Sequence, residues 1–248
     1  MGSQGISPND LQNPATLQTV VNNVQTASPT ANSEVVYAAV LPSSFSLISS
    51  NRVGAVKNQG GCASCVGFST SSTLESTLKT QGVNMVVSAA DIFFCVGYAD
   101  ASCANGWSID TAARKVSQYG FVSDSCFAYK PVQQACTFGC PQGRHLGLVS
   151  HHIPSTVEAK RHILTNGAVL TALTVYEDFM NCCSNNQVYH QGANQPLVGG
   201  HAVACVGWDD TLQAWLCQNS WDTWWGTKGF FWIGYGQSGI MGDMYGFV

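Results

Sequence analysis

Positive charge is scarce in this sequence. Lys and Arg together number 10 among 248 residues, Asp and Glu number 14, and the formal net charge is −4. The sequence has no run of basic residues with interleaved aromatic residues. Proteins that bind the phosphate backbone of nucleic acids concentrate Lys and Arg on one face. A nucleic-acid partner is therefore not expected.

Long apolar runs are missing as well. No stretch of the sequence approaches the ~20 consecutive apolar residues that a membrane-spanning helix needs. Residues 1–20 are polar and contain no basic segment followed by an apolar one. No signal peptide is therefore visible in this chain, and no membrane contact is expected.

Large apolar side chains are few in residues 1–40, which are rich in Asn, Gln, Ser and Thr and carry three prolines, Pro8, Pro14 and Pro29. A segment of this composition cannot bury a core of its own. One short helix is expected over residues 11–24. We therefore expect residues 1–40 to be an appendage to a domain that spans residues 41–248.

Cysteine, in contrast, is abundant, with 11 residues. Reducing compartments rarely accumulate so many thiols without a metal or a catalytic reason. Setting aside Cys65 as a candidate nucleophile leaves ten, and an even number suits a protein with disulfides from an oxidising compartment. Cys205 and Cys217 lie in apolar, strand-like runs, where small buried hydrophobic residues are an equally good interpretation.

Helical patterns come first along the domain and strand patterns follow. Helices are expected over residues 65–80, 88–98 and 109–119, and Ser155 and Glu158 form a capping box for a helix that stops at Asn166-Gly167. Strands are expected over residues 168–176, 201–208, 214–218, 229–233 and 243–248. This segregation predicts an α+β fold with a helical lobe of about residues 55–150 and a β-rich lobe of about residues 151–248.

Three polar side chains stand out as a possible catalytic set: Cys65, His201 and Asn219. A thiol, an imidazole and a carboxamide are the parts of a nucleophilic site whose members are distant in sequence and adjacent in the fold. A helix N-terminus and a protonated imidazole would stabilise the thiolate of Cys65. His201 would take and return the proton, and Asn219 would orient its ring. We expect the three to meet in a cleft between the lobes.

The spacing Cys62-x-x-Cys65 also occurs in thiol-redox motifs and in half of a zinc site. A redox role would leave His201 and Asn219 without a purpose. A second cysteine pair with the spacing of zinc ligands is missing, because Cys136 and Cys140 are separated by three residues. We therefore expect neither a metal nor another cofactor.

Three blocks of the sequence resemble the signature blocks of papain-type cysteine proteases: QGGCASC at residues 59–65, GGHAVACVGW at 199–208 and QNSWDTWWGTKGFFWI at 218–233. Several local blocks are similar to cathepsin B. The resemblance implies the papain-like two-lobe fold, with the nucleophile on a helix of the first lobe and a β-barrel-like second lobe. It further implies a monomeric endopeptidase that acts on peptide or protein substrates in a lysosome or vacuole, or outside the cell.

The resemblance also assigns roles to single residues. The side-chain amide of Gln59 and the backbone N–H of Cys65 would form an oxyanion hole. The resemblance puts Asp243 at the floor of the S2 pocket, where a carboxylate would pair with a basic P2 side chain; an exposed Asp in a glycine-rich turn is the alternative. The remaining substrate-binding residues that it implies are Asn105, Gly106, Gly200 and Trp221, and Trp221 would also shield the hydrogen bond between Asn219 and His201.

Disulfides and processing follow from the same resemblance. It implies the pairs Cys62–Cys103, Cys95–Cys136 and Cys126–Cys140, and leaves the adjacent Cys182 and Cys183 without an evident partner, since a bond between neighbours is strained. Residues 1–40 occupy the place of a zymogen propeptide and would be a possible inhibitor of their own enzyme. The segment 126–140 contains no His, unlike the occluding loop of cathepsin B, so an open cleft and endopeptidase action are expected, with His151 and His152 as the possible substitutes for that loop.

The sequence departs from the family pattern at three positions near the site. Val66 replaces a Trp, Asn105 replaces a Gly, and Asp222 follows Trp221 where a Gly is usual. None of these changes removes a catalytic group. They are the only support for a second hypothesis, in which the chain is a catalytically silent homologue that acts as a binding protein.

Overall fold

The computed structural model describes residues 41–136, 139–141 and 143–248. Every expectation for residues 1–40, including their short helix and their position as a propeptide, lies outside the described residues. The described chain has the α+β organisation that the sequence predicts, with helices and a single sheet packed on each other.

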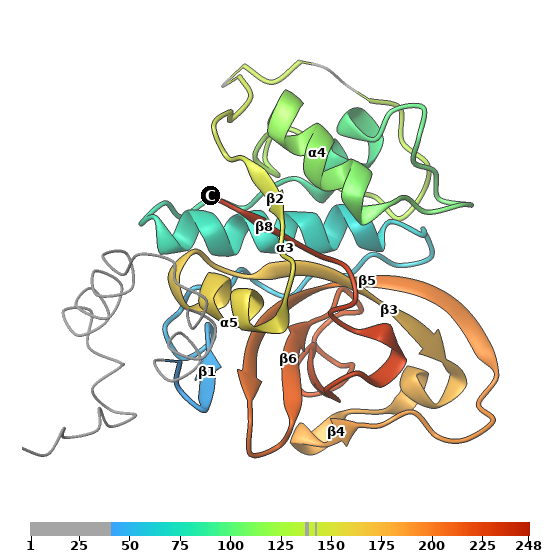
Figure 1. Ribbon diagram of the computed structural model, residues 1–248. Coiled ribbons are helices and arrows are strands. Elements are labelled where there is room, and N and C mark those ends of the chain that lie inside the picture. Colours follow the sequence, from blue (N-terminus) through green and yellow to red (C-terminus); the bar gives the residue numbers. More distant parts are fainter. Residues whose placement is uncertain (1–40, 137–138, 142) are drawn as a thin grey trace, which may run out of the picture.

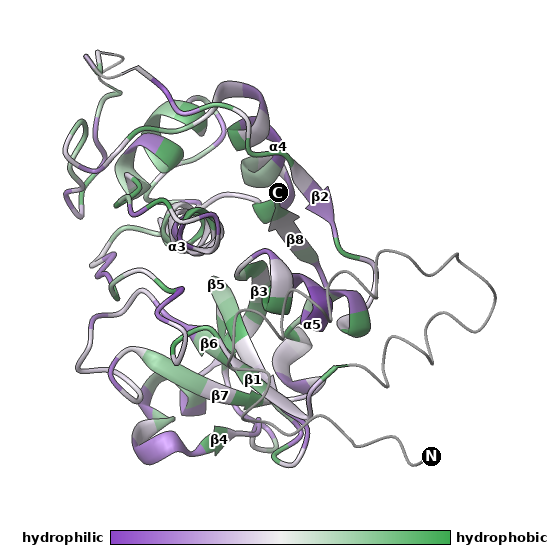
Figure 2. Cartoon of the chain, turned by 90° about the vertical axis from the view of Figure 1, so that its left-hand side faces the viewer, coloured by the Kyte–Doolittle hydropathy of each residue, from purple (hydrophilic) through white to green (hydrophobic). Residues whose placement is uncertain are grey.

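The helix α3 (Cys65–Thr80) crosses the middle of the molecule, with α4 (Ile109–Tyr119) on one side and most of the sheet on the other (Figure 1). Figure 2 looks along α3 and shows it between these two parts. The π-helix η2 (Asp91–Val96) lies within the expected helix over 88–98, and α5 (Thr156–Thr165) begins after Ser155, whose hydroxyl accepts a hydrogen bond from Glu158 N at 3.2 Å. The short 3₁₀ helices are η3 (Glu177–Asn181), η4 (Ser184–Asn186) and η5 (Gln237–Gly239).

The helix α3 is buried over most of its length although it is rich in serine and threonine. These residues are poor helix formers because their hydroxyls compete for backbone partners. Some of these hydroxyls bond within the helix itself: Thr73 donates to the carbonyl of Ser69 at 2.8 Å, and Thr80 donates to the carbonyl of Ser76 at 2.9 Å. The hydroxyls of Ser71 and Ser76 donate outside the helix, to the carbonyls of Val87 and Arg52, and the buried hydroxyl of Thr70 has no hydrogen-bond partner among the described residues.

The strands of the described residues form one open eight-stranded sheet. Its order is β2-β8-β3-β5-β6-β7-β4, and β1 pairs with β5 outside this path. The strand bounds are β1 (Ser44–Ser46), β2 (Ser150–His152), β3 (Val169–Tyr176), β4 (Val188–Tyr189), β5 (Leu197–Asp209), β6 (Ala214–Gln218), β7 (Phe230–Gly234) and β8 (Met244–Phe247). Because the path ends at β2 and β4, the sheet of the described residues is open and does not close into a barrel.

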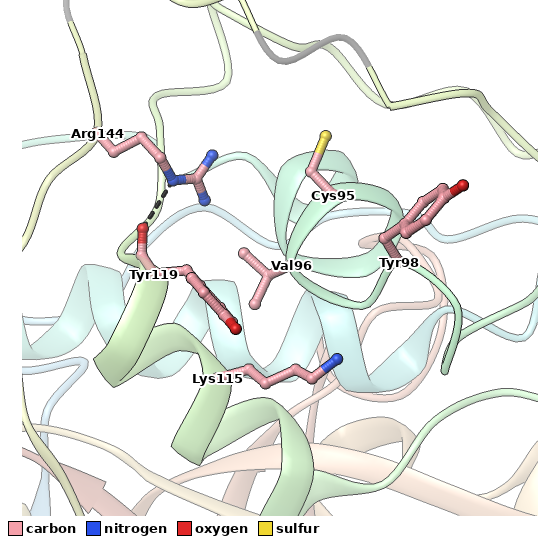
Figure 3. Close-up of a pocket in the computed structure, with 6 residues that line it drawn as sticks. All are labelled: Cys95, Val96, Tyr98, Lys115, Tyr119 and Arg144. Atoms are coloured by element: carbon pink, nitrogen blue, oxygen red, sulfur yellow. Dashed lines mark hydrogen bonds between the residues drawn. The ribbon is translucent and has the colours of Figure 1, made fainter.

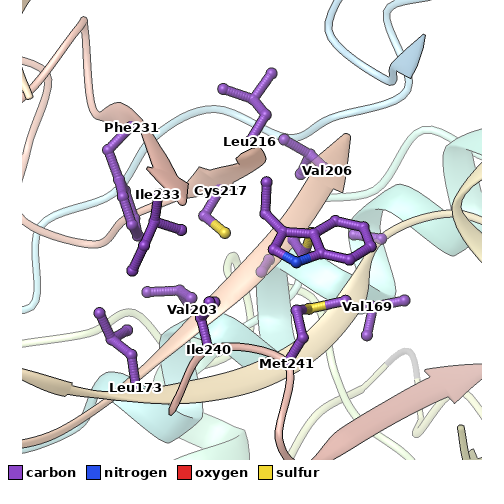
Figure 4. Close-up of a cluster of buried hydrophobic side chains, with 14 of the residues drawn as sticks. Val169, Leu173, Val203, Val206, Leu216, Cys217, Phe231, Ile233, Ile240 and Met241 are labelled. Atoms are coloured by element: carbon purple, nitrogen blue, oxygen red, sulfur yellow. The ribbon is translucent and has the colours of Figure 1, made fainter. Parts of the chain in front are cut away.

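Two large apolar cores meet at the sheet. One lies within the sheet part, and Figure 4 shows members from β3, β5, β6 and β7, among them Val169, Val203, Leu216, Phe231 and Ile233. The other joins α3 and α4 to the strands through Leu170, Ala202 and Phe247. Because α3 packs directly on β5, the start of the helix is held against the strand that carries His201.

Four disulfides are present, and three of them join the pairs that the resemblance implies: Cys62–Cys103, Cys95–Cys136 and Cys126–Cys140. The fourth joins the neighbours Cys182 and Cys183, which the sequence left without a partner. Cys205 and Cys217 are buried, unbridged thiols on facing positions of β5 and β6. The interpretation of these two as small buried hydrophobic residues is the better one.

Candidate active site

Cys65 is the first residue of α3 and is a free, half-buried thiol. The loop that leads to it is tight: Gly60 adopts φ 57°, and Gly60 N donates to Asn58 Oδ1 at 2.8 Å. Burial raises the pKa of the Cys65 thiol, and interactions with the backbone N–H groups of Ala202, Val66 and Cys65 itself lower it in part. These N–H groups are the features that would favour the thiolate.

His201 lies in β5 and Asn219 directly follows β6, its antiparallel neighbour. His201 Nε2 and Asn219 Oδ1 are 2.7 Å apart. Asn219 Oδ1 also accepts the backbone N–H of Ser220 at 2.8 Å, which identifies this atom as the amide oxygen. His201 Nε2 therefore carries the hydrogen, and in the neutral ring Nδ1 is the atom that can accept a proton.

The imidazole of His201 is buried. Burial lowers its pKa to about 4, and its hydrogen bond to Asn219 raises it in part. Ala202, the next residue, offers its backbone N–H to the Cys65 thiol, so β5 brings His201 to the nucleophile's side of the fold. Burial thus disfavours the charged form of each group taken alone.

Gln59 is fixed beside this pair by four hydrogen bonds. Its Nε2 donates to the carbonyl of Cys62 at 3.0 Å, and its Oε1 accepts the Ser220 hydroxyl at 2.7 Å. Its backbone N–H donates to the carbonyl of Ser220 at 2.9 Å, and its carbonyl accepts the Tyr129 hydroxyl at 2.7 Å. Since Nε2 carries two hydrogens, this amide has a second N–H to donate.

Trp221 covers the His201 ring. The two rings stack with centroids 4.6 Å apart and an interplanar angle of 29°. Trp221 also contacts Trp225 and Phe179 edge-on, at centroid distances of 5.0 and 5.8 Å. The indole thus covers one face of the buried His201 ring.

The residues expected to bind substrate are more scattered. Gly106 has φ 72°, and a Cβ placed on it would stand 3.5 Å from the carbonyl of Ala63, so this segment borders the loop before Cys65. Asn105 precedes it on the same turn, where its N–H donates to the carbonyl of Ser102 at 3.3 Å. Gly200 is exposed in β5 and pairs with Thr174 of β3.

Asp243 lies just before β8 and is half exposed. One of its carboxylate oxygens is 3.6 Å from His152 Nε2, and its carbonyl accepts the Thr171 hydroxyl at 2.9 Å. His151 and His152 belong to β2 and pair with β8. Both are held in a strand, and their role as substitutes for an occluding loop stays a prediction.

Sequence reasoning missed two polar partners of the site. The hydroxyls of Ser220 and Tyr129 both bind Gln59, and Tyr129 also shares a 2.8 Å hydrogen bond with Ser64. Ser220 sits between Asn219 and Trp221 and could have been suspected from that position. Tyr129 comes from a loop distant in sequence, and nothing in its local pattern points to the site.

A separate hollow lies on the helical side of the molecule, lined by η2, α4 and Arg144 (Figure 3). Its two cations already have partners: Lys115 pairs with Asp100 at 2.5 Å, and Arg144 binds Asp91 with two nitrogens at 2.7 and 2.8 Å. None of the residues that line it belongs to the candidate catalytic set.

Within the described residues, no three His, Cys, Asp or Glu side chains come together as ligands for a metal ion. Cys62 is bonded to Cys103, so Cys62 and Cys65 do not form a redox pair here. Among the described helices, none has the length and apolar character needed to cross a membrane.

Comparison with known proteins finds cathepsin-like proteinases among the relatives of this chain. A cathepsin L-like proteinase of Fasciola hepatica is 30% identical over 186 residues, covering 73% of this chain and 56% of that protein. Cathepsin B-like cysteine proteinase 3 of Caenorhabditis elegans is 28% identical over 223 residues, covering 76% and 59%. The chain thus spans less than two thirds of the length of these curated relatives.

Solved structures of the same kind share the fold. The proCathepsin B S9 of Trypanosoma congolense superposes with a TM-score of 0.71 at 25% identity, covering 83% of this chain and 76% of that one. The digestive procathepsin L2 of Tenebrio molitor gives a TM-score of 0.73 at 28% identity, covering 84% and 68%. The family model described as "Papain family cysteine protease" matches residues 41–246. The chain therefore belongs to the papain family of cysteine proteases.

Proposed function

We propose that this protein is a cysteine endopeptidase in which Cys65, His201, Asn219 and Gln59 carry the reaction. The observation that carries the proposal is the buried hydrogen bond of 2.7 Å between His201 and Asn219, on the strand whose next N–H reaches the Cys65 thiol. A proton acceptor, its orienting amide and a nucleophile at a helix start are together what acyl transfer from a peptide requires.

In the first half of the reaction, the Cys65 thiolate attacks the carbonyl carbon of a peptide bond. The oxyanion that forms receives hydrogen bonds from Gln59 Nε2 and the backbone N–H of Cys65. The C–N bond then breaks, and the imidazolium of His201 gives its proton to the leaving amine. The acyl fragment remains bound to Cys65 as a thioester.

In the second half, water attacks the thioester carbonyl while His201 takes one of its protons. The C–S bond breaks, the acid product leaves, and the proton returns to the Cys65–His201 pair. Asn219 holds the imidazole through Nε2 in both halves, so that Nδ1 serves as donor and acceptor in turn.

Labelling with an epoxide or vinyl-sulfone probe tests the proposal, because such probes react with an activated thiolate. We expect one label per chain at Cys65, none on Cys65→Ser, and no peptide turnover by Cys65→Ala. Buried Cys205 and Cys217 provide internal controls, since neither should react in the folded protein. Full peptidase activity in Cys65→Ala would refute the proposal, and an unreactive but folded wild type would favour the silent homologue.

We also propose endopeptidase cleavage. The segment that would correspond to an occluding loop is closed by the Cys126–Cys140 disulfide and contains no His. Product analysis on a long peptide should show internal cuts, with rates insensitive to amidation of the substrate's C-terminus. Release of mainly dipeptides from free C-termini would contradict this.

An inhibitory role for residues 1–40 is a further part of the proposal. The structural relatives named above are procathepsins. If residues 1–40 cover the cleft, trimming them should raise the rate of probe labelling at Cys65 without changing its pH profile. Equal rates before and after trimming would argue against an inhibitory segment.

A further inference from the structure

Asp222 follows Trp221 on the segment that begins at Asn219. This segment is fastened antiparallel to the loop before Cys65: Asp222 N donates to the carbonyl of Lys57 at 3.1 Å, and Asn58 and Trp221 form a β-bridge. The side chain of Asp222 is therefore held where the Gln59 loop and the Trp221 segment meet.

The carboxylate of Asp222 has a fixed direction. Its Oδ2 accepts Asn58 Nδ2 at 3.2 Å, and its Oδ1 accepts the backbone N–H of Thr223 at 2.6 Å. The hydrogen bonds from Thr223 and Asn58 lower its pKa, which favours the ionised carboxylate. The residue is partly exposed, and no Lys or Arg side chain of the described residues forms an ion pair with it.

The backbone at Asp222 also points to a role for this side chain. Its φ of 70° is a left-handed conformation that glycine adopts without strain and that other residues adopt at a cost. An Asp here tolerates that conformation because its carboxylate bonds the next backbone N–H. A charged group kept at a glycine-favouring position beside the site is a candidate for contact with substrate.

The reaction geometry decides which part of the substrate passes Asp222. His201 must reach both the Cys65 sulfur and the leaving nitrogen, so the leaving fragment lies on the His201 side of the broken bond. Trp221 stacks on His201, and Asp222 is its neighbour. The residues that follow the broken bond therefore run past Trp221 toward Asp222.

We propose that Asp222 selects a basic side chain among the first two residues after the cleaved bond. This inference rests on the proposed function and names its substrate preference: peptides with Arg or Lys on the leaving-group side. An exposed ion pair of this type changes affinity by a few-fold, so the expected preference is about three-fold for Arg over Gln and larger over Glu.

The test uses internally quenched peptides that differ only in the two residues after the cleaved bond, carrying Arg, Gln or Glu. Wild type should cleave them in the order Arg, Gln, Glu by kcat/KM. Asp222→Asn keeps the size and tolerates the left-handed backbone, and Asp222→Gly removes the strain. In both variants the Arg-to-Gln ratio of kcat/KM should fall about three-fold. Glu158→Gln on α5, an equal change in charge outside the site, should keep the wild-type ratio.

A second substrate separates this inference from the proposed function. A peptide joined to aminomethylcoumarin carries no residues after the broken bond, so its kcat/KM should be equal in wild type, Asp222→Asn and Asp222→Gly. If Asp222→Asn cleaves all substrates and keeps the wild-type Arg-to-Glu ratio of kcat/KM, the role of Asp222 is overturned and the proposed function is not. Absence of turnover by folded wild type with every substrate would overturn both.

Discussion

The indole of Trp221 lies on the imidazole of His201 at a centroid distance of 4.6 Å, and the same imidazole donates to Asn219 at 2.7 Å. The ring is thus fixed on one face and at one edge. Only the Nδ1 edge is left for proton exchange with Cys65 and substrate. The protonation of His201 at Nδ1 is therefore the property that the first experiment below measures.

Replacing Asn219 by Ala should shift the pH profile of probe labelling. Burial lowers the pKa of His201 to about 4, and its hydrogen bond to Asn219 raises it in part. Loss of the bond lowers the pKa further, so the imidazolium that stabilises the thiolate is lost at a lower pH. A hydrogen bond to a charged group contributes about 1.5–3 kcal/mol, and 1.36 kcal/mol corresponds to one pH unit. The alkaline limb should therefore move down by about 1–2 units.

Asn219→Asp is the matched variant for this experiment. A carboxylate in place of the amide favours the imidazolium, so its alkaline limb should move to higher pH than that of wild type. Coincident alkaline limbs for wild type, Asn219→Ala and Asn219→Asp would show that Asn219 does not influence the charge of His201.

Asp243 provides a prediction on the acyl side of the substrate. If Asp243 lies at the bottom of the S2 pocket, the enzyme should cleave peptides with Arg at P2 as well as those with Phe. Asp243→Ala should then reduce the Arg-to-Phe ratio of kcat/KM several-fold. His152 stands 3.6 Å from the same carboxylate and would compete with Arg for it. His152→Gln should therefore raise the ratio. An unchanged ratio in Asp243→Ala would remove this residue from substrate recognition.

His162 should make the fold sensitive to acid. It is buried, its Nε2 has no hydrogen-bond partner among the described residues, and its ring lies 5.1 Å from that of His151. Burial, and then the neighbouring His151, lower its pKa to about 3. Because the unfolded residue has a pKa of about 6.5, the unfolded chain binds an extra proton between these values. Stability then falls with decreasing pH, by up to ~1.4 kcal/mol per unit.

The variant His162→Phe removes this titration while keeping an aromatic ring. When the pH is lowered from 6.5 to 4.5, the free energy of unfolding of this variant in urea titrations should fall by about 2 kcal/mol less than that of wild type. His190→Gln, at an exposed histidine, should follow the wild-type curve. Parallel curves for wild type and His162→Phe would rule out His162 as a source of acid sensitivity.

Glu75 should be needed for the stability of α3. Its carboxylate is 2% exposed, pairs with Lys57 Nζ at 2.5 Å and accepts the backbone N–H of Val87 at 2.8 Å. Removing one partner of a buried pair leaves the other charge uncompensated, at a cost of about 3 kcal/mol. Glu75→Gln should show this loss in chemical unfolding, and Lys57→Met in the same background should recover part of it. Additive effects of the two changes would mean that the pair is not coupled.

Local sequence patterns predict the helices of this protein better than its strands. The predicted helix over 65–80 is α3 (Cys65–Thr80), and that over 109–119 is α4, because capping residues and periodicity are signals along the chain itself. The strands β1, β2 and β4 are not predicted, since two or three residues become a strand only when a partner lies beside them. Whether the sheet closes is likewise not visible in the sequence, because pairing between distant strands leaves no local pattern.

The site shows the same division. Cys65, His201, Asn219 and Gln59 stand in blocks whose order suggested their association. The pairing of His152 with Asp243 was not foreseen, since these residues meet only because β2 lies against β8. The bond between Cys182 and Cys183 was likewise not expected, because the sequence offered only a strained pairing of neighbours.

The Cys62–Cys103 disulfide places an oxidised sulfur three residues before the nucleophile. Thiol reagents that keep Cys65 reduced also attack disulfides by exchange. Opening this bond would release a second thiol beside Cys65 and detach the Gln59 loop from its anchor at Cys103. Activity should therefore rise with added reductant and then decline. At low reductant concentration oxidation of Cys65 would limit activity, and at high concentration loss of the Cys62–Cys103 cross-link would limit it.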